Sequence, residues 1–183
     1  MRQPQLWIFK EVKNMDIKKI KVGNVPNEVN VFIEIPKDGN IKYELDKESG
    51  VIFVDRFLHT TMSYPFNYGF IPNTLSEDGD PIDVLVLSEQ AVMPGVVIPS
   101  KVIGMLEMED EAGIDTKVLA VPTEKIDPFF GEINDISEVN NSIKNKVKHF
   151  FENYKTLEPG KWVKIKEWKG KKEAIAAVKK SIK

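Results

Sequence analysis

Three carboxylates stand within six residues in the segment DGDPID, residues 78–83. In an extended chain Asp78 and Asp80 point to the same side, roughly 7 Å apart, and Pro81 can turn the chain so that Asp83 joins them. Like charges this close repel one another unless cations neutralise them, and oxygen ligands select magnesium, manganese or calcium. The segment therefore indicates a metal site, although Asp, Gly and Pro also form ordinary solvated turns.

A calcium-binding loop of the EF-hand type is a second interpretation of the same segment. Glu89 occupies the twelfth position if Asp78 is the first. The pattern fails elsewhere, because Ile82 stands where a ligand belongs and Asp83 where the turn glycine belongs.

Charged side chains also alternate with apolar ones in two earlier segments, VFIEIP and IKYELD. The period of two predicts strands in which Glu34, Lys42 and Glu44 line one surface. A solvated outer face would produce the same alternation. Arg56 follows on an otherwise apolar strand face, where it implies a partner anion or a strand end.

The remaining candidates lie at predicted chain turns or element ends. Residues 110–117 read as a charged hairpin tip that would bring Asp110, Asp115 and Lys117 together, although such tips are common on protein surfaces. Tyr64 and Tyr68 could pack in a core or donate hydrogen bonds to phosphate oxygens. Two further candidates lie near the end of a predicted helix. Tyr154 lies on the apolar stripe of that helix, and Lys155 follows it.

Composition limits the chemistry that these residues can perform. The chain has 183 residues, 42% of them hydrophobic, enough for one compact domain with a sizeable core. It has no cysteine, which excludes disulfides and thiolate chemistry and suits a reducing compartment. The formal net charge is −2, so bulk charge suggests no polyanion partner. No apolar run reaches the ~20 residues of a membrane span.

The element pattern predicts a mainly β fold with flanking helices. Short apolar runs read as strands at residues 31–35, 41–45, 51–57, 84–87, 96–108 and 117–121. Helical spacing follows at residues 137–157, with Ser137 as the cap, then a strand at 162–168 and a helix at 173–182 that faces Ile175, Val178 and Ile182 inward. We expect residues 15–183 to form one domain, and residues 1–14 to be an extension or the product of an early start codon.

Together these segments resemble the soluble inorganic pyrophosphatases of the single-domain bacterial type. The family signature, Asp-x-Asp-Pro-aliphatic-Asp-aliphatic, stands here as DGDPIDV. It is accompanied, in the family's order, by FIEIP, IKYELDKESG, VDRF, YPFNYGFIPNT, DEAGIDTK and HFFENYKTLEPGKWV. The resemblance covers roughly residues 29–168.

The resemblance implies a role for each matching position. Asp80 corresponds to the general base. The positions that correspond to metal ligands are Asp78, Asp83, Asp110 and Asp115. Those that correspond to phosphate-gripping groups are Lys42, Arg56, Tyr68, Lys117, Tyr154 and Lys155. Glu34, Glu44, Tyr64 and Glu111 correspond to supporting residues.

The same resemblance implies the fold, the activity and the setting. The expected fold is a five-stranded OB-like closed barrel with two C-terminal helical segments packed outside. The expected activity is magnesium-dependent hydrolysis of pyrophosphate to two orthophosphates by a metal-activated water, with several ions per site and manganese or zinc as substitutes. We expect a cytoplasmic homohexamer with no nucleic-acid or membrane partner.

Two other functions fit part of the pattern. An OB-type nucleic-acid module would need a basic groove, whereas the predicted cleft is rich in Asp and Glu. A different metal phosphohydrolase, acting on nucleotides or phosphate esters, is the nearer alternative. The sequence has no Gly-x-Ser-x-Gly elbow and no phosphate-binding Gly-x-x-x-x-Gly-Lys loop, so it shows no motif for a serine nucleophile or for nucleoside triphosphates. A missing motif does not exclude the alternative phosphohydrolase.

Overall fold

A computed structural model describes residues 16–76 and 79–183. Its strands are β1 (Val29–Ile35), β2 (Ile41–Asp46), β3 (Val51–Phe57), β4 (Asn67–Phe70), β5 (Asp83–Val86), β6 (Val97–Asp110), β7 (Gly113–Ile114), β8 (Lys117–Pro122) and β9 (Val163–Gly170). The helices are α1 (Asn141–Asn153) and α2 (Lys171–Ser181), with short 3-10 turns η1 (Ile17–Lys19) and η2 (Ile136–Glu138). The prediction for residues 1–14 lies outside the described residues.

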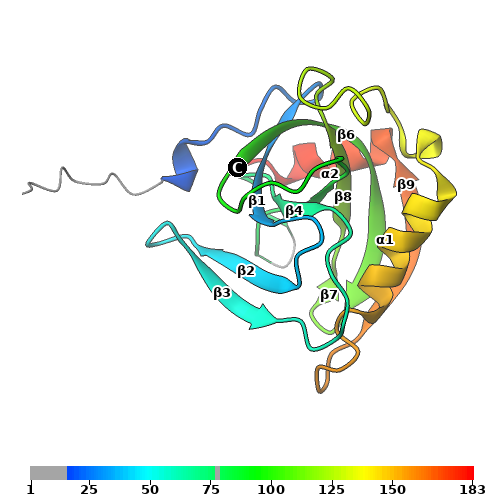
Figure 1. Ribbon diagram of the computed structural model, residues 1–183. Coiled ribbons are helices and arrows are strands. Elements are labelled where there is room, and N and C mark those ends of the chain that lie inside the picture. The colour runs from blue at the N-terminus through cyan, green and yellow to red at the C-terminus, as the bar shows by residue number, and fades with distance from the viewer. Residues whose placement is uncertain (1–15, 77–78) are drawn as a thin grey trace, which may run out of the picture.

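Five of the strands close into a ring. The order is β1-β4-β5-β8-β6, and β1 pairs with β6 to complete the circle. The pairing of β5 with β8 is parallel, and the other pairings in the ring are antiparallel. β6 also pairs with β7 and β9, so this one long strand joins the ring to these two additional strands (Figure 1). The predicted mainly β, OB-like fold with two C-terminal helices is confirmed.

Both faces of the ring strands are buried, which explains their continuous apolar runs. On β5, Val84 and Val86 contact a cluster that includes Val178 of α2. Leu85 faces the other cluster, which includes Phe151 of α1. In Figure 1, α1 lies along β9 on the outside of the ring, and α2 runs across β6. Because each fully buried Val or Leu contributes about 1.5–3 kcal/mol, strand direction and register are firmly fixed at this point.

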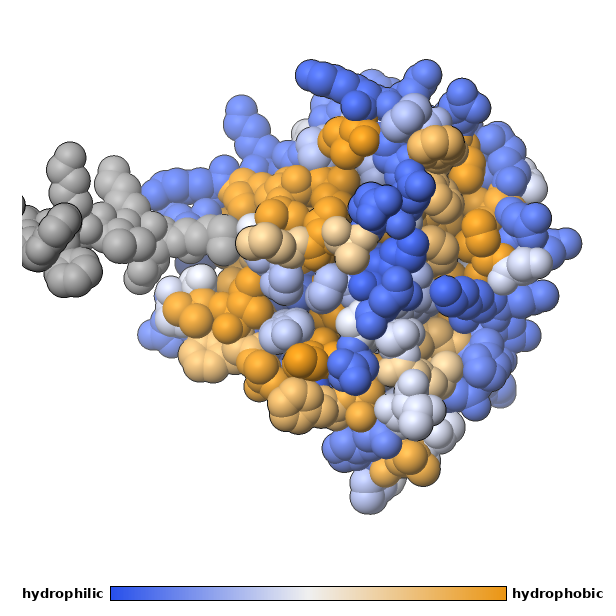
Figure 2. Space-filling view, viewed as in Figure 1, coloured by the Kyte–Doolittle hydropathy of each residue, from blue (hydrophilic) through white to orange (hydrophobic). Residues whose placement is uncertain are grey.

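The hairpin of β2 and β3 stands apart from the ring as its own two-stranded sheet (Figure 1). β3 is half exposed along its length, so Arg56 does not interrupt a dry core there. The strand-end or partner-anion interpretation of Arg56 is therefore the relevant one. Figure 2 shows apolar side chains gathered over this hairpin, where Val51, Phe53, Val54 and Phe57 are exposed.

The predicted bounds of both helices were wrong: α1 spans Asn141–Asn153 and not 137–157, and α2 spans Lys171–Ser181 and not 173–182. Ser137 lies in η2, and α1 begins only after Asn140, whose side chain accepts a hydrogen bond from the Ser142 amide. Asn is as good an N-cap as Ser, so the helical spacing alone could not choose between them. In α2 the buried side chains include Ala174 and Val178, whereas Ile182 lies past the helix end and is partly exposed.

Candidate active site

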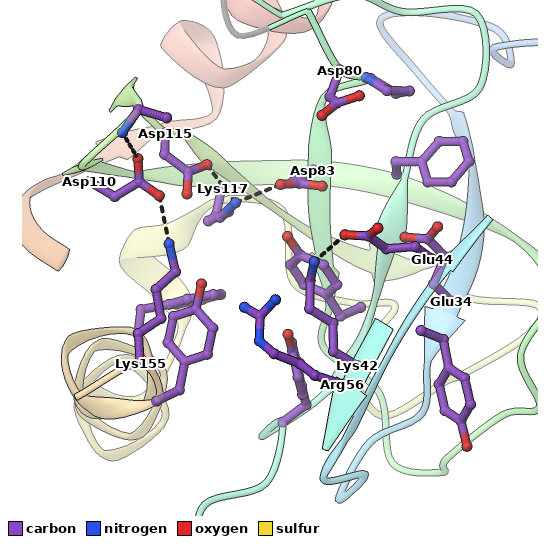
Figure 3. A pocket seen from close by; sticks show the side chains of 18 of the residues that line it. Glu34, Lys42, Glu44, Arg56, Asp80, Asp83, Asp110, Asp115, Lys117 and Lys155 are labelled. Carbon is purple, nitrogen blue, oxygen red and sulfur yellow. Dashed lines mark hydrogen bonds and ion pairs between the residues drawn. The ribbon is translucent and has the colours of Figure 1, made fainter. Parts of the chain in front are cut away.

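A cavity of about 380 Å³ opens at the end of the ring where β5 and β8 begin (Figure 3). Its lining comes from the ring, from the β2–β3 hairpin, from the tip of the β6–β7 hairpin and from the end of α1. Among the lining residues are thirteen of the fifteen predicted site residues, Glu34, Lys42, Glu44, Arg56, Tyr64, Tyr68, Asp80, Asp83, Asp110, Asp115, Lys117, Tyr154 and Lys155. The structure thus brings together segments that lie far apart in the sequence.

The other two predicted residues are placed differently. Asp78 lies outside the described residues, so its predicted metal-ligand role stays a prediction. Glu111 does not line the cavity; it lies 2.5 Å from the ammonium of Lys161 and 3.8 Å from that of Lys155, and both lysines do line it. Burial raises the pKa of Glu111, but its hydrogen bonds, first among them that from Lys161, and the charge of Lys155 outweigh burial and lower the pKa to about 2, so this carboxylate stays charged.

Lys117 lies between two carboxylates at the cavity floor. Its ammonium is 2.5 Å from Asp83 Oδ2 and 2.5 Å from Asp115 Oδ1, and its side chain is 5% exposed (Figure 3). Burial lowers the pKa of Lys117, but the two carboxylates outweigh burial and raise it above its ordinary value. The ammonium is therefore permanently charged, and it shows that this pair of carboxylates can hold a cation between them.

Lys155 makes a second buried ion pair, on the wall formed by the end of α1 and the β6–β7 tip. Its ammonium lies 2.6 Å from Asp110 Oδ2, and both side chains are 10% exposed. Lys155 directly follows the C-cap residue of α1, and Asp110 ends β6. The helix dipole alone would have accounted for a lysine at this point, but the structure assigns it a specific carboxylate partner.

The β2–β3 hairpin supplies the cations of the third wall. Lys42 forms ion pairs with Glu44 and with Asp55, and the distance to Asp55 is 3.1 Å. Arg56 donates from Nη1 to Asp55, 2.6 Å away, and from Nε to Glu158, 3.0 Å away. The surface expected for Glu34, Lys42 and Glu44 is thus one wall of the cavity and not a solvated outer face.

Two acids in the cavity differ sharply in environment. Burial raises the pKa of Glu34 to about 7, opposed by a hydrogen bond from the Leu45 amide at 2.7 Å and assisted by the charge of Asp83. Asp80, by contrast, has a 72% exposed side chain at the cavity mouth, where Lys47 lies 2.7 Å from its carboxylate. Glu34 can therefore exchange a proton near neutral pH, and Asp80 is open to solvent.

The three tyrosines are buried side by side against α1. The ring of Tyr64 lies 5.2 Å from Tyr68 and 6.4 Å from Tyr154, measured between centroids. Burial raises the pKa of all three phenols, so each hydroxyl keeps its proton. The predicted core packing is confirmed, and all three residues also line the cavity, so hydrogen bonding of the phenols to phosphate stays a prediction.

Several polar groups around the cavity escaped prediction. Lys47 and Lys161 line it and pair with Asp80 and Glu111, and Glu158 pairs with Arg56. Lys47 belongs to the block IKYELDKESG and the other two to TLEPGKWV, so the sequence signal was present. The sequence could not show which residue each of them pairs with, since the partners lie 33 to 102 residues apart in the chain.

One polar cavity combines positively charged side chains and phenol donors, which bind phosphate oxygens, with carboxylates, which bind hard cations. This combination suits an enzyme that acts on phosphate groups with the help of a divalent metal ion. Within residues 16–76 and 79–183, no three acidic or histidine side chains converge on one metal position. Fold and cavity together therefore define an enzyme that acts on phosphate groups and is built on a closed, OB-like ring of β-strands.

Comparison with known proteins gives the particular family. Residues 31–183 match the model of the inorganic pyrophosphatase family. The inorganic pyrophosphatase of Aquifex pyrophilus is 58% identical over 92% of this chain and 96% of its own length, and that of Saccharolobus solfataricus is 59% identical over 86% and 91%.

Solved structures agree with this assignment. The inorganic pyrophosphatase of Helicobacter pylori has a TM-score of 0.87 at 50% identity, covering 90% of this chain and 96% of that one. The enzyme from Thermus thermophilus has a TM-score of 0.88 at 45% identity, covering 92% and 97%. The chain belongs to the inorganic pyrophosphatase family and is a hydrolase of pyrophosphate.

Proposed function

We propose that the chain hydrolyses pyrophosphate to two orthophosphates with magnesium as its cofactor and water as the nucleophile. The observation that carries the proposal is the bridging position of Lys117 between Asp83 and Asp115, in a cavity also lined by Lys42 and Arg56. One cavity therefore offers carboxylates that can bind a cation and positively charged side chains that can bind an anion.

The donor set fits a hard divalent ion. Asp83, Asp115 and Asp110 would hold it together with Asp78, and every donor is a carboxylate oxygen, which magnesium prefers over nitrogen or sulfur. When bound, magnesium neutralises phosphate charge and lowers the pKa of coordinated water. Manganese and zinc remain substitutes to be compared in the same assay.

The residues of the chain divide the remaining work. Lys42, Arg56, Lys117 and Lys155 hold phosphate oxygens, and the phenols of Tyr68 and Tyr154 donate hydrogen bonds to them. Asp80 accepts a proton from the attacking water. The water oxygen forms a bond to one phosphorus while the bridging P–O bond breaks, and the departing orthophosphate keeps the bridging oxygen.

Phosphate release from pyrophosphate tests the proposal directly. Purified protein should release two orthophosphates per pyrophosphate in magnesium, and activity should disappear in EDTA and return when magnesium is restored. ATP and a phosphate monoester serve as parallel substrates for the alternative of a broader phosphohydrolase. Equal rates on all three substrates, or full activity in EDTA, would contradict the proposal.

We further propose a homohexamer in the cytoplasm. The exposed apolar side chains of β3 support association of copies, because a contiguous apolar patch is better buried against another chain. The absence of cysteine is compatible with a reducing compartment. Within the described ranges, no helix is long and apolar enough to cross a membrane. Sedimentation equilibrium tests the assembly, and a monomer at micromolar concentration would contradict it.

A further inference from the structure

Glu158 is a buried carboxylate that faces a cavity residue without lining the cavity itself. Its side chain is 8% exposed, and Oε1 accepts a hydrogen bond from Arg56 Nε at 3.0 Å. It lies in the turn that follows α1, where its own amide donates to the Lys155 carbonyl at 2.8 Å. A carboxylate this buried is costly unless it is paired, so the contact with Arg56 accounts for its position.

The contact at Nε constrains Arg56 in a particular way. A guanidinium is planar, with five N–H donors in a fixed fork, so a partner at Nε and a second at Nη1 fix the plane of the whole group. Asp55 is that second partner, at 2.6 Å. Burial lowers the pKa of Arg56, and the charges of Glu158 and Asp55 more than offset this effect, so the group stays charged. Figure 3 shows the fork directed into the cavity.

The turn that carries Glu158 also touches the opposite wall. Lys155 pairs with Asp110 and Lys161 pairs with Glu111, both at the β6–β7 tip, whereas Glu158 reaches the β2–β3 hairpin. Residues 155–161 therefore connect two walls that belong to different sheets. The turn after α1 therefore links Arg56 on one wall to the β6–β7 tip on the other.

We propose that Glu158 is a positioning residue, which holds the Arg56 guanidinium in the orientation that grips a phosphate group. The proposal rests on the phosphate-binding role proposed above for Arg56. It assigns Glu158 no contact with substrate, and it makes the turn after α1 part of the binding apparatus.

A simple charge effect predicts the opposite result, which makes the inference testable. If Glu158 only added negative charge near the substrate, its removal would strengthen binding of the pyrophosphate anion and lower KM. If it orients Arg56, Glu158→Ala should raise KM for pyrophosphate about tenfold and change kcat by less than about threefold, because misplaced binding groups lose affinity. Glu158→Gln keeps an acceptor oxygen and should raise KM less than Glu158→Ala.

A double-mutant cycle with Arg56→Ala provides the decisive measurement. If Glu158 acts through Arg56, Glu158→Ala should have no further effect on KM in the Arg56→Ala background. The double variant also leaves neither charge buried alone, so it remains interpretable if the single variant folds poorly. Glu152→Gln, which removes a half-exposed carboxylate from α1 and leaves the cavity untouched, serves as the control with an unchanged KM.

Each outcome has one meaning. A lower KM for Glu158→Ala, or equal effects of Glu158→Ala in the presence and absence of Arg56, would overturn the positioning role. A normal KM for Arg56→Ala would instead overturn the phosphate-binding role of Arg56. Wild-type activity on pyrophosphate, measured in the same series, reports on the proposed reaction independently of both.

Discussion

Asp83 and Lys117 are register partners on the parallel strands β5 and β8, and the Lys117 ammonium lies 2.5 Å from Asp83 Oδ2. Each is the first residue of its strand. The apolar residues that follow them fix the register of the two strands, since a one-residue slip would turn buried side chains to the wrong face. The ion pair is thus placed by the core beneath it.

This pairing predicts that the contribution of Lys117 to stability depends on magnesium. In EDTA, Lys117→Met leaves Asp83 and Asp115 without their shared cation and should lower the free energy of unfolding by about 3 kcal/mol. Magnesium can replace the missing charge, so the loss should shrink by at least about 1 kcal/mol in the presence of the metal. Urea denaturation in both buffers measures the difference.

Lys148→Met is the matched control for that measurement. Lys148 forms a 3.7 Å ion pair with Glu152 on the exposed face of α1. Loss of a solvent-exposed pair should change stability by less than about 0.5 kcal/mol in either buffer. A Lys117→Met loss that is the same with and without magnesium would argue against a metal at Asp83 and Asp115.

Asp80→Asn and Asp83→Ala should separate catalysis from metal binding. Asp80 is exposed at the cavity mouth and Asp83 lies at the floor beside Lys117. Loss of a general base costs about 10²–10⁴ in rate, so Asp80→Asn should lower kcat by at least about a hundredfold and leave the magnesium dependence nearly unchanged. Asp83→Ala should shift the magnesium activation curve to higher concentration. Equal losses of metal affinity in both variants would rule out this division of roles.

Glu34→Gln should remove a pH-dependent loss of stability. Burial raises the pKa of Glu34 from 4.5 to about 7, so between these values the folded protein binds more protons than the unfolded chain. Stability contributed by this group is therefore present at low pH and is lost as pH rises through about 7. In EDTA at pH 8, Glu34→Gln should be more stable than wild type by roughly 2 kcal/mol, with no gain at pH 4. A gain of equal size at both pH values would show that titration of Glu34 is not its cause.

Gly69→Ala should be strongly destabilising. Gly69 lies on β4 opposite Ile33, and an added Cβ would lie 1.8 Å from the Phe32 carbonyl oxygen. Because backbone must shift within the ring, we expect a loss of at least about 3 kcal/mol in the free energy of unfolding. Gly170→Ala is the control, since its Cβ would meet side-chain oxygens only, Glu173 Oε2 at 3.3 Å and Asp135 Oδ2 at 3.5 Å, and it should cost less than about 1 kcal/mol. Similar thermal midpoints for both variants would contradict the close approach.

Much of the fold follows from local pattern. The apolar runs at residues 84–87 and 117–121 predicted β5 and β8 nearly to their ends, because buried parallel strands need a continuous apolar stretch. The run NYGF, which forms β4, was read only as part of a tyrosine-rich block, since its glycine and asparagine are poor strand formers. Asn67 is buried and accepts hydrogen bonds from the amides of Lys37 and Val92, so tertiary contacts override its local preference.

The candidate site was predicted as a set of residue types, and its pairings were not. A charged tip at residues 110–117 indicated that Asp115 and Lys117 lie near each other, and the structure places them 2.5 Å apart. No local pattern could assign Asp110 to Lys155 or Arg56 to Glu158, because Lys155 and Glu158 lie in the turn after α1, 45 and 102 residues from their strand partners.

The cavity is lined from two sheets of different size, the ring with its added strands and the separate β2–β3 hairpin. The acids Asp83 and Asp115 stand on or beside strands that are paired on both sides, whereas Lys42 and Arg56 stand on a sheet of only two strands. A two-stranded sheet opens at lower free energy than a buried ring, so its amide protons should exchange with solvent earlier. The contact between Arg56 and Glu158 joins this hairpin to the turn after α1, so the hairpin side of the cavity depends on that contact more than the floor does.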